Sequence, residues 1–409
     1  MKTPNHTMHL PKGLYLSPMV RGSELAMRML AREHGNASLC YSPMLRDKDV
    51  ISVHQQWKET TNKEKWKRVQ IDAAGRTDSV EETAYLLIHD TCTDDTANCV
   101  VQLCGSSPES IGQATAAVLD LYANINDCVL PAGIDLNLGC PQQCASDEGF
   151  GAFLVERNPE AAISCISSMR SAIDSHCIQL MGNKPTLSAK IRLMKSFDDT
   201  LFFIRKLHKA GIDYIAIHCR LPKDKHDGGA DWDTGRKIVA ALESTLPVIL
   251  NGGVCDYDCA TSMLKQTNCH AVMIATGYLH NHRNFHPSDT CISVSELSIA
   301  CEYLDYAEMY PPPSYLYIQK HLRWILRHIL QPSDDFTFDK YDFSDPRVKL
   351  WTFLVRPYLR SIAQFRLFLA LCVKLLHDED RTNRIPESIS SLIEDVSFKI
   401  VKEGGQTNQ

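Results

Sequence analysis

Several side chains that could bind a polar ligand or transfer a proton stand at the ends of short apolar stretches. Cys140 lies between a glycine and a proline, and its thiol could donate a proton or attack as a thiolate. Lys190 occupies another apolar stretch, where an ammonium group is costly to bury unless it meets an anion. Gln102 and His218 add hydrogen-bond donors and acceptors. Each is more often structural when taken singly, but together they predict one polar site.

Two glycine-containing turns follow the last two apolar stretches. They are Asn251–Gly252–Gly253 and Thr276–Gly277. In eight-stranded α/β barrels, the loops after strands seven and eight commonly bind phosphate through backbone N–H groups, and a Cβ atom there would block the anion. These glycines could instead serve only to make tight turns. Their two positions nevertheless favour a bound phosphate.

The alternation of apolar and amphipathic stretches indicates the elements that would position these side chains. Short, continuously apolar stretches are typical of parallel strands buried on both faces. We expect eight such strands at residues 14–19, 39–44, 99–104, 134–138, 187–193, 214–219, 247–250 and 271–275. Helical spacing of apolar residues predicts helices at 23–33 (capped by Ser23), 109–122, 198–210, 233–243 and 255–266. The pattern predicts a (β/α)8 TIM barrel with its active site at the carboxyl ends of the strands, although a doubly wound open sheet fits almost as well.

Residues 46–98 break this alternation. This long connection contains Trp57, Trp66 and the basic run Lys63, Lys65, Lys67 and Arg68. We expect an elaborated surface insertion of the barrel. Its tryptophans could stack on bases, but packing within the insertion is the preferred interpretation.

The strand pattern ends near residue 285. Helices are predicted at 315–330, 344–359 and 362–376. Residues 320–374 contain ten Lys or Arg against five Asp or Glu, a net charge of +5 in a chain whose total is −6. Such local basicity indicates a surface for an anionic partner. We therefore expect a catalytic domain over 1–290, a helical domain over 291–402 and a polar tail over 403–409.

Composition excludes several classes of protein. Apolar residues make up 44% and charged residues 22% of the 409 residues, as in a folded globular protein. No stretch approaches the roughly 20 apolar residues of a membrane span, and the N-terminus lacks a secretory signal. The sixteen cysteines are scattered, which predicts reduced thiols in the cytoplasm or also the nucleus. The pairs Cys140/Cys144 and Cys255/Cys259 lack the further ligands of a zinc site, so we expect no metal.

Seven short motifs, in order along the chain, resemble those of the tRNA-dihydrouridine synthases. They are PMV at Pro18, CYSPM at Cys40, QLCGSSPE at Gln102, DLNLGCPQ at Asp135, AKIR at Ala189, IHCR at Ile217 and NGGV at Asn251. DLNLGCPQ with the downstream GFGAFL at Gly149 is the most specific part. The resemblance continues through PPSYLYIQKHLRWILR at Pro312 into the family's helical tRNA-binding domain, and it is strongest to the eukaryotic branch that modifies uridines 16 and 17.

The resemblance implies an FMN-dependent reduction of the uracil C5–C6 double bond in tRNA, with NADPH or NADH as the reductant. Cys140 would donate a proton to C5 as a general acid. By position, the residues that would contact the flavin ring are Pro18, Met19, Val20, Gln102, Lys190 and His218. Those that would hold its phosphate are Asn251, Gly252, Gly253, Ala275 and Thr276. Asn137 and Arg220 would face the uracil, and Lys320, Arg323 and Arg327 would grip the tRNA.

The sequence departs from the family pattern near this expected site. The loop Gln142–Glu148 carries Asp147 and Glu148 where a basic residue is usual, and the family's HGR is replaced by His218-Cys219-Arg220. Two alternatives therefore stay open. The chain could be an RNA-binding protein with little catalysis, or another FMN barrel that reduces a small pyrimidine. We expect the protein to be a monomer.

Overall fold

The computed structural model describes residues 10–34, 36–60, 79–88, 93–125, 129–180, 184–225, 228–282, 295–331, 346–355 and 359–378. The chain forms two compact units, which among these residues run from 10 to 282 and from 295 to 378. No helix in the described ranges is long and apolar enough to cross a membrane.

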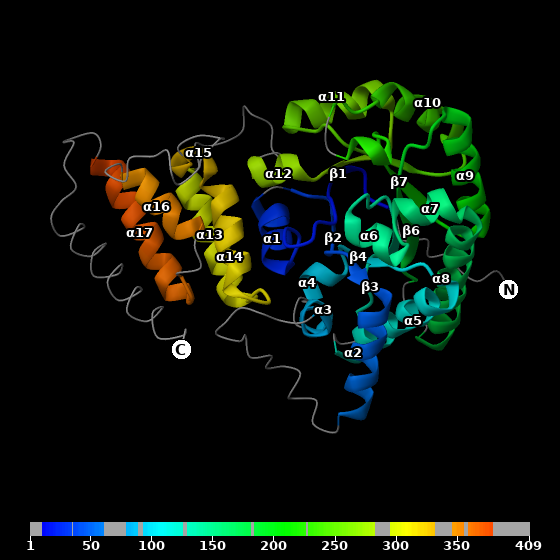
Figure 1. Cartoon of the computed structure of the whole chain (residues 1–409), viewed down its shortest axis with the longest axis horizontal. Coiled ribbons are helices and arrows are strands. Elements are labelled where there is room, and N and C mark those ends of the chain that lie inside the picture. Colours follow the sequence, from blue (N-terminus) through cyan, green and yellow to red (C-terminus); the bar gives the residue numbers. More distant parts are fainter. Residues whose placement is uncertain are drawn as a thin grey trace. The chain divides into compact units, whose positions relative to one another are not determined.

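The first unit is a closed barrel of eight parallel strands (Figure 1). A parallel ladder runs in the order β2, β1, β9, β8, β7, β6, β5, β4, and the pairing of β2 with β4 closes the ring. The strands are β1 Gly13–Leu16, β2 Leu39–Tyr41, β4 Cys99–Cys104, β5 Gly133–Leu138, β6 Thr186–Arg192, β7 Tyr214–His218, β8 Val248–Asn251 and β9 Ala271–Ile274. The barrel prediction is confirmed, and each strand overlaps one predicted apolar stretch. A two-residue strand, β3 Leu45–Arg46, pairs with β4 and was not expected.

Burial on both faces explains why these strands read as continuous apolar runs. One buried cluster inside the unit combines side chains of β1, β2, β4, β7, β8 and β9, including Tyr15, Val100 and Ile249. Tyr41 and Tyr214 also belong to it, and their hydroxyl groups share a hydrogen bond of 2.9 Å. The barrel is thus filled by side chains and is not a pore.

Helices surround the strands of the first unit (Figure 1). They are α1 Leu25–Met29, α2 Asp47–Glu59, α3 Ser79–Ile88, α4 Thr93–Thr96, α5 Pro108–Ile125, α6 Gln143–Glu148, α7 Ala152–Arg157, α8 Pro159–Leu180, α9 Phe197–Ala210, α10 Trp232–Leu242, α11 Tyr257–Thr267 and α12 Thr276–His280. Ser196, Asp231 and Asp256 cap α9, α10 and α11 through their side-chain oxygens. The predicted cap Ser23 is wrong, because Glu24 is the N-cap of α1 and the Ser23 hydroxyl binds the backbone of Met19.

The connection 46–98 is partly integrated into the barrel. Its first helix, α2, directly follows the short strand β3 and packs against α5, as does α3. Trp57 is buried, at 5% exposure, which confirms the packing interpretation for that side chain. Trp66 and the basic run lie outside the described residues. Part of this segment is therefore the ordinary helix that the second strand requires.

The second unit is helical. Its helices are α13 Glu296–Met309, α14 Tyr315–Ile325, α15 Arg327–Leu330, α16 Pro346–Val355 and α17 Ile362–Asp378. α13 packs against α14 and α17, and α14 packs against α16 (Figure 1). The buried Tyr303 hydroxyl and His321 Nδ1 share a hydrogen bond of 2.7 Å across α13 and α14. The single helix expected over 315–330 is interrupted at Leu326.

Candidate active site

A cavity of about 640 Å³ opens at the carboxyl ends of the barrel strands. This is the volume range of ordinary small-molecule sites. Every barrel residue that the sequence analysis proposed for a ligand lines it: Pro18, Met19, Val20, Gln102, Asn137, Cys140, Lys190, His218, Arg220, Asn251, Gly252, Gly253, Ala275 and Thr276. Side chains separated by up to 258 positions in the sequence thus meet in one pocket because the strands are parallel and in register.

Cys140 is positioned by two glycine-containing segments. It follows β5 after Gly139, and its carbonyl oxygen accepts a hydrogen bond of 3.1 Å from the Ala152 backbone N–H. Gly151 has a φ of +65°, and a Cβ atom there would lie 2.7 Å from that same carbonyl oxygen. Only glycine suits both the backbone angle and the close approach. The GFGAFL motif therefore supports the Cys140 loop directly.

The thiol of Cys140 is in its protonated form near neutral pH. Partial burial raises its pKa, and a backbone hydrogen bond at Gln142 together with the positive charges of Arg192 and Lys190 opposes that rise only in part. A thiol of this kind is a poor nucleophile, because the thiolate is the attacking form. It is better suited to donating a proton.

Asn137 fixes the Cys140 loop through side-chain hydrogen bonds. Its side-chain oxygen accepts hydrogen bonds from the backbone N–H groups of Gly139 at 3.1 Å and Cys140 at 3.0 Å. Its amide nitrogen donates to Gln102 Oε1 at 3.0 Å. Asn137 was expected to face a uracil, yet its polar atoms are already engaged within the protein. Its observed role is to position the loop.

A buried carboxylate orients Gln102. Asp135 Oδ2 accepts from Gln102 Nε2 at 2.8 Å, and Oδ1 accepts from the Ser188 hydroxyl at 2.6 Å. Burial raises the pKa of Asp135 to about 6, although Ser188, Gln102 and Lys190 favour its charged form. Because Gln102 Oε1 accepts from Asn137 and Nε2 donates to Asp135, the side-chain amide is fixed in one orientation. Its remaining Nε2 hydrogen is the group it can still offer as a donor.

Lys190 and Arg192 place positive charge in the pocket. They stand two positions apart on β6 and so lie on the same side of the strand. Burial, with a smaller contribution from Arg192, lowers the pKa of Lys190 to about 8, while Asp135 acts in the opposite direction. A negatively charged ligand group would offset the free-energy cost of burying the charged Lys190 ammonium.

His218 and Gly252 form the next part of the pocket wall. Gly252 has a φ of +109°, and a Cβ atom there would lie 2.6 Å from the His218 ring. Gly253 also has a positive φ, +73°. Arg220 Nη1 donates to His218 Nε2 at 3.1 Å, so this nitrogen acts as an acceptor here. In this tautomer the ring hydrogen is on Nδ1, so the donor atom of His218 is Nδ1 and not Nε2.

The remaining ends of β8 and β9 complete this side. Asn251 is buried and its amide nitrogen donates to the Met273 carbonyl oxygen at 2.7 Å, which ties β8 to β9. Ala275 and Thr276 lie at the start of α12. Their backbone thus borders the cavity beside the two glycines.

Comparison with known proteins agrees with this geometry. A family model described as dihydrouridine synthase (Dus) matches residues 15–340, which is most of the chain. The chain belongs to the dihydrouridine synthase family.

Relatives within this family carry different position numbers in their names. A Rattus norvegicus protein named tRNA-dihydrouridine(16/17) synthase [NAD(P)(+)]-like is 30% identical over 319 residues, covering 77% of this chain and 60% of the relative. A Schizosaccharomyces pombe tRNA-dihydrouridine(16/17) synthase is 29% identical and covers 66% of this chain and 57% of its own length. A Homo sapiens tRNA-dihydrouridine(20a/20b) synthase-like protein is 25% identical, with 79% and 84% covered. This chain thus spans little more than half of the 16/17 relatives.

Sequence reasoning missed Arg192, which also lines this pocket. Its Nε donates to the Gly139 carbonyl oxygen at 3.0 Å, and Nη1 donates to the Leu221 carbonyl oxygen at 3.1 Å. Burial lowers its pKa to about 10, and the nearby Arg220 adds to this effect. The signal was present, since Arg192 follows Lys190 by two residues in the AKIR motif.

The three basic residues proposed for tRNA belong to the second unit of the chain. Lys320 Nζ lies 4.7 Å from the ring centroid of Trp324. Arg323 is half-buried, and its Nε is buried without a hydrogen-bond partner within the described part of the chain. Arg327 begins α15. Lys320 and Arg323 are thus on α14, and Arg327 is on α15.

Proposed function

We propose that this chain reduces the C5–C6 double bond of D-loop uridines in tRNA, at positions 16 and 17, with FMN as the cofactor and NADPH or NADH as the reductant. The observation that carries the proposal is that Cys140, Lys190 and the Gly252–Gly253 turn line the same pocket. Such a reduction needs a proton donor for the base, a cation beside the flavin ring and backbone that is open to the flavin phosphate.

The pocket has the features that a flavin mononucleotide would need. The positive φ angles of Gly252 and Gly253, and the absence of side chains there, leave the backbone open to a phosphate. Lys190 would balance negative charge on the ring, and Gln102 has an N–H hydrogen left for it. Pro18–Val20 would back the ring. When bound, FMN would supply the hydride that adds to C6 of the base.

Cys140 would complete the reduction by giving its thiol proton to C5 of the base. Its raised pKa keeps the proton in place at neutral pH, and Asn137 and Gly151 fix the loop that carries it. General acid catalysis requires such a donor within hydrogen-bond reach of the reacting atom. The thiolate that remains would be reprotonated from solvent, because Cys140 is partly exposed.

The second unit would bind the tRNA. Extruding a uridine from folded RNA costs a few kcal/mol, about the worth of several phosphate contacts. Lys320 and Arg327 supply cations for such contacts. Arg323, which is half-buried, would add a further cation beside them. This role accounts for the net +5 charge of residues 320–374.

The deciding experiment uses the purified full chain, FMN, NADPH and tRNA prepared without dihydrouridine. We expect a flavin spectrum that NADPH bleaches and dihydrouridine at positions 16 and 17, mapped by reverse transcription after alkaline cleavage. Cys140→Ala should retain flavin but form no product, whereas Cys144→Ala, an exposed thiol on α6, should remain active.

Each alternative predicts a different result. A colourless, folded protein would refute the cofactor assignment. Turnover of free uracil or uridine without tRNA would identify a small-pyrimidine reductase, and tRNA binding without flavin or product would identify an RNA-binding protein. Full activity of Cys140→Ala would remove its role as the acid.

A further inference from the structure

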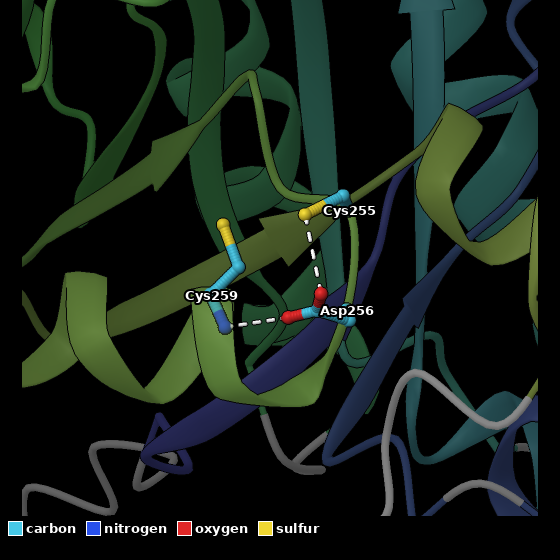
Figure 2. A group of neighbouring side chains, drawn as sticks. All are labelled: Cys255, Asp256 and Cys259. Atoms are coloured by element: carbon cyan, nitrogen blue, oxygen red, sulfur yellow. Dashed lines mark hydrogen bonds between the residues drawn. The ribbon is translucent and has the colours of Figure 1, made fainter.

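A second group of reactive side chains lies at the start of α11. Cys255, Asp256 and Cys259 lie close together there, with the Asp256 carboxylate facing the Cys255 thiol (Figure 2), and the ligand atoms of all three lie within 4.8 Å of one another. Within the described ranges this is the one group of three or more His, Cys, Asp or Glu side chains with such spacing. Cys255 and Asp256 are exposed and Cys259 is partly exposed, so the group is accessible from solvent.

The start of α11 fixes this arrangement. Asp256 is the N-cap, and its Oδ1 accepts from the Cys259 backbone N–H at 2.7 Å (Figure 2). The carboxylate is therefore held with its other oxygen, Oδ2, 3.3 Å from Cys255 Sγ. Cys259 stands in the first turn of the helix, and its Sγ donates to the Gly253 carbonyl oxygen at 3.6 Å. A hydrogen-bonded carboxylate is oriented in advance, as ligating side chains in metal sites are.

The distance between the Cys255 thiol and the Asp256 carboxylate matches that between two ligands of a tetrahedral ion. With Zn–S distances of about 2.3 Å and Zn–O distances of about 2.0 Å, two sulfur ligands lie about 3.8 Å apart and a sulfur and an oxygen about 3.5 Å apart. The observed 3.3 Å between Cys255 Sγ and Asp256 Oδ2 is close to the second value. Thiolates are soft ligands, so they select zinc-like ions over magnesium or calcium.

We propose that Cys255, Asp256 and Cys259 bind one zinc-like divalent cation, with solvent as the fourth ligand. Binding replaces two S–H bonds by two metal–sulfur bonds, and both protons leave to solvent. From the sequence we expected no metal, because the Cys255/Cys259 pair lacks the further ligands of a zinc site; Asp256 is a third ligand that the helix cap adds. Because Cys255 also lines the pocket beside Gly253, the ion would stand at the rim of the candidate active site. The inference does not depend on the proposed reaction.

The test measures metal binding by the full chain in the reduced state, without substrate. Zn²⁺ alone is titrated against a chromophoric chelator, and Cd²⁺ alone is followed by its ultraviolet thiolate charge-transfer band. We expect one equivalent that Cys255→Ser and Cys259→Ser each lose or weaken at least about tenfold. Cys301→Ser, which removes an exposed thiol on α13, should leave this equivalent unchanged.

Asp256→Asn separates the ligand from the helix cap. Asparagine is as good an N-cap as aspartate, so α11 and the melting temperature should be preserved while metal affinity falls about tenfold. Three results would overturn the proposal: no bound equivalent in the wild-type chain, full retention of it in both serine variants, or recovery of Cys255 and Cys259 as a disulfide from freshly alkylated protein.

Discussion

The side-chain oxygen of Asn137 lies 3.0 Å from the backbone nitrogen of Cys140 and accepts its hydrogen bond. Asn137, three positions before the predicted acid, thus fixes the position of the loop that carries the thiol. Through Gln102, the same asparagine is connected to the buried Asp135. The Cys140 loop is therefore fixed by the barrel interior as well as by its own sequence.

Asn137→Ala should reduce kcat for dihydrouridine formation by about 10- to 100-fold, because a displacement of about 1 Å at a reacting group costs that much. Flavin binding should fall less than the rate, since the proposed flavin contacts of Lys190 and the Gly252–Gly253 turn remain and only Gln102 loses its Asn137 partner. Single-turnover rates and flavin fluorescence measure the two effects. Asn124→Ala, at an exposed site on α5, is the matched control. A normal rate in Asn137→Ala would show that the loop keeps its position without this bond.

Gly252→Ala should weaken FMN binding at least about tenfold, because the new Cβ would lie 2.6 Å from the His218 ring at a backbone angle that alanine rarely adopts. Isothermal titration of the apoprotein with FMN measures this. Gly229→Ala provides the comparison, since no atom lies within 4 Å of a Cβ at that position. Equal affinities in the two variants would argue against a phosphate at the Gly252 turn.

Asp135→Asn should make stability less dependent on pH. The folded-state pKa of Asp135 is raised to about 6 from 3.8, so the folded protein binds more protons than the unfolded chain between these values. Wild-type stability relative to the variant should consequently fall by a few kcal/mol as pH rises from 4 to 6. Urea unfolding at several pH values tests this sign. A difference that grows with pH would show that the carboxylate stabilises the fold as an anion.

Lys320→Glu and Arg327→Glu should each weaken tRNA binding and reduce the salt dependence of log K by about one unit per lost phosphate contact. Arg323 is better replaced by Lys, because its half-buried side chain makes charge reversal a threat to the fold. Filter binding at several salt concentrations gives the slopes. Lys237→Glu, exposed on α10 of the first unit, controls for total charge. An unchanged slope in the Lys320 and Arg327 variants would exclude this surface.

The predictable part of the site follows from strand geometry. Cys140, Lys190 and His218 could be assigned to one pocket because the carboxyl ends of parallel strands meet at one end of a barrel. The hydrogen-bond network could not be predicted, since the engagement of Asn137 and Gln102 depends on register between neighbouring strands. Their chemical roles, and those of the tRNA-facing residues, stay predictions.

The helices were less predictable than the strands. α8, at 22 residues the longest helix in the described part of the chain, was not foreseen, because its many small and polar residues give a weak periodic signal. α2 was not predicted as a separate helix, because residues 46–98 form an unusually long connection that we interpreted as a surface insertion. Ser23 matched a cap by type, but its hydroxyl serves the Met19 loop instead. Local patterns thus indicated which segments fold, while tertiary contacts decided how they begin and end.

Gly151 abuts the carbonyl group of Cys140, with the short helix α6 folded between them. Anyone who transplants this thiol into another barrel would accordingly have to move residues 137–152 as one block. A graft of Gly139–Pro141 alone would lose the contact of Gly151 and Ala152 with the Cys140 carbonyl group. A β-branched residue at position 151 would clash with that carbonyl group and displace the loop that carries the thiol.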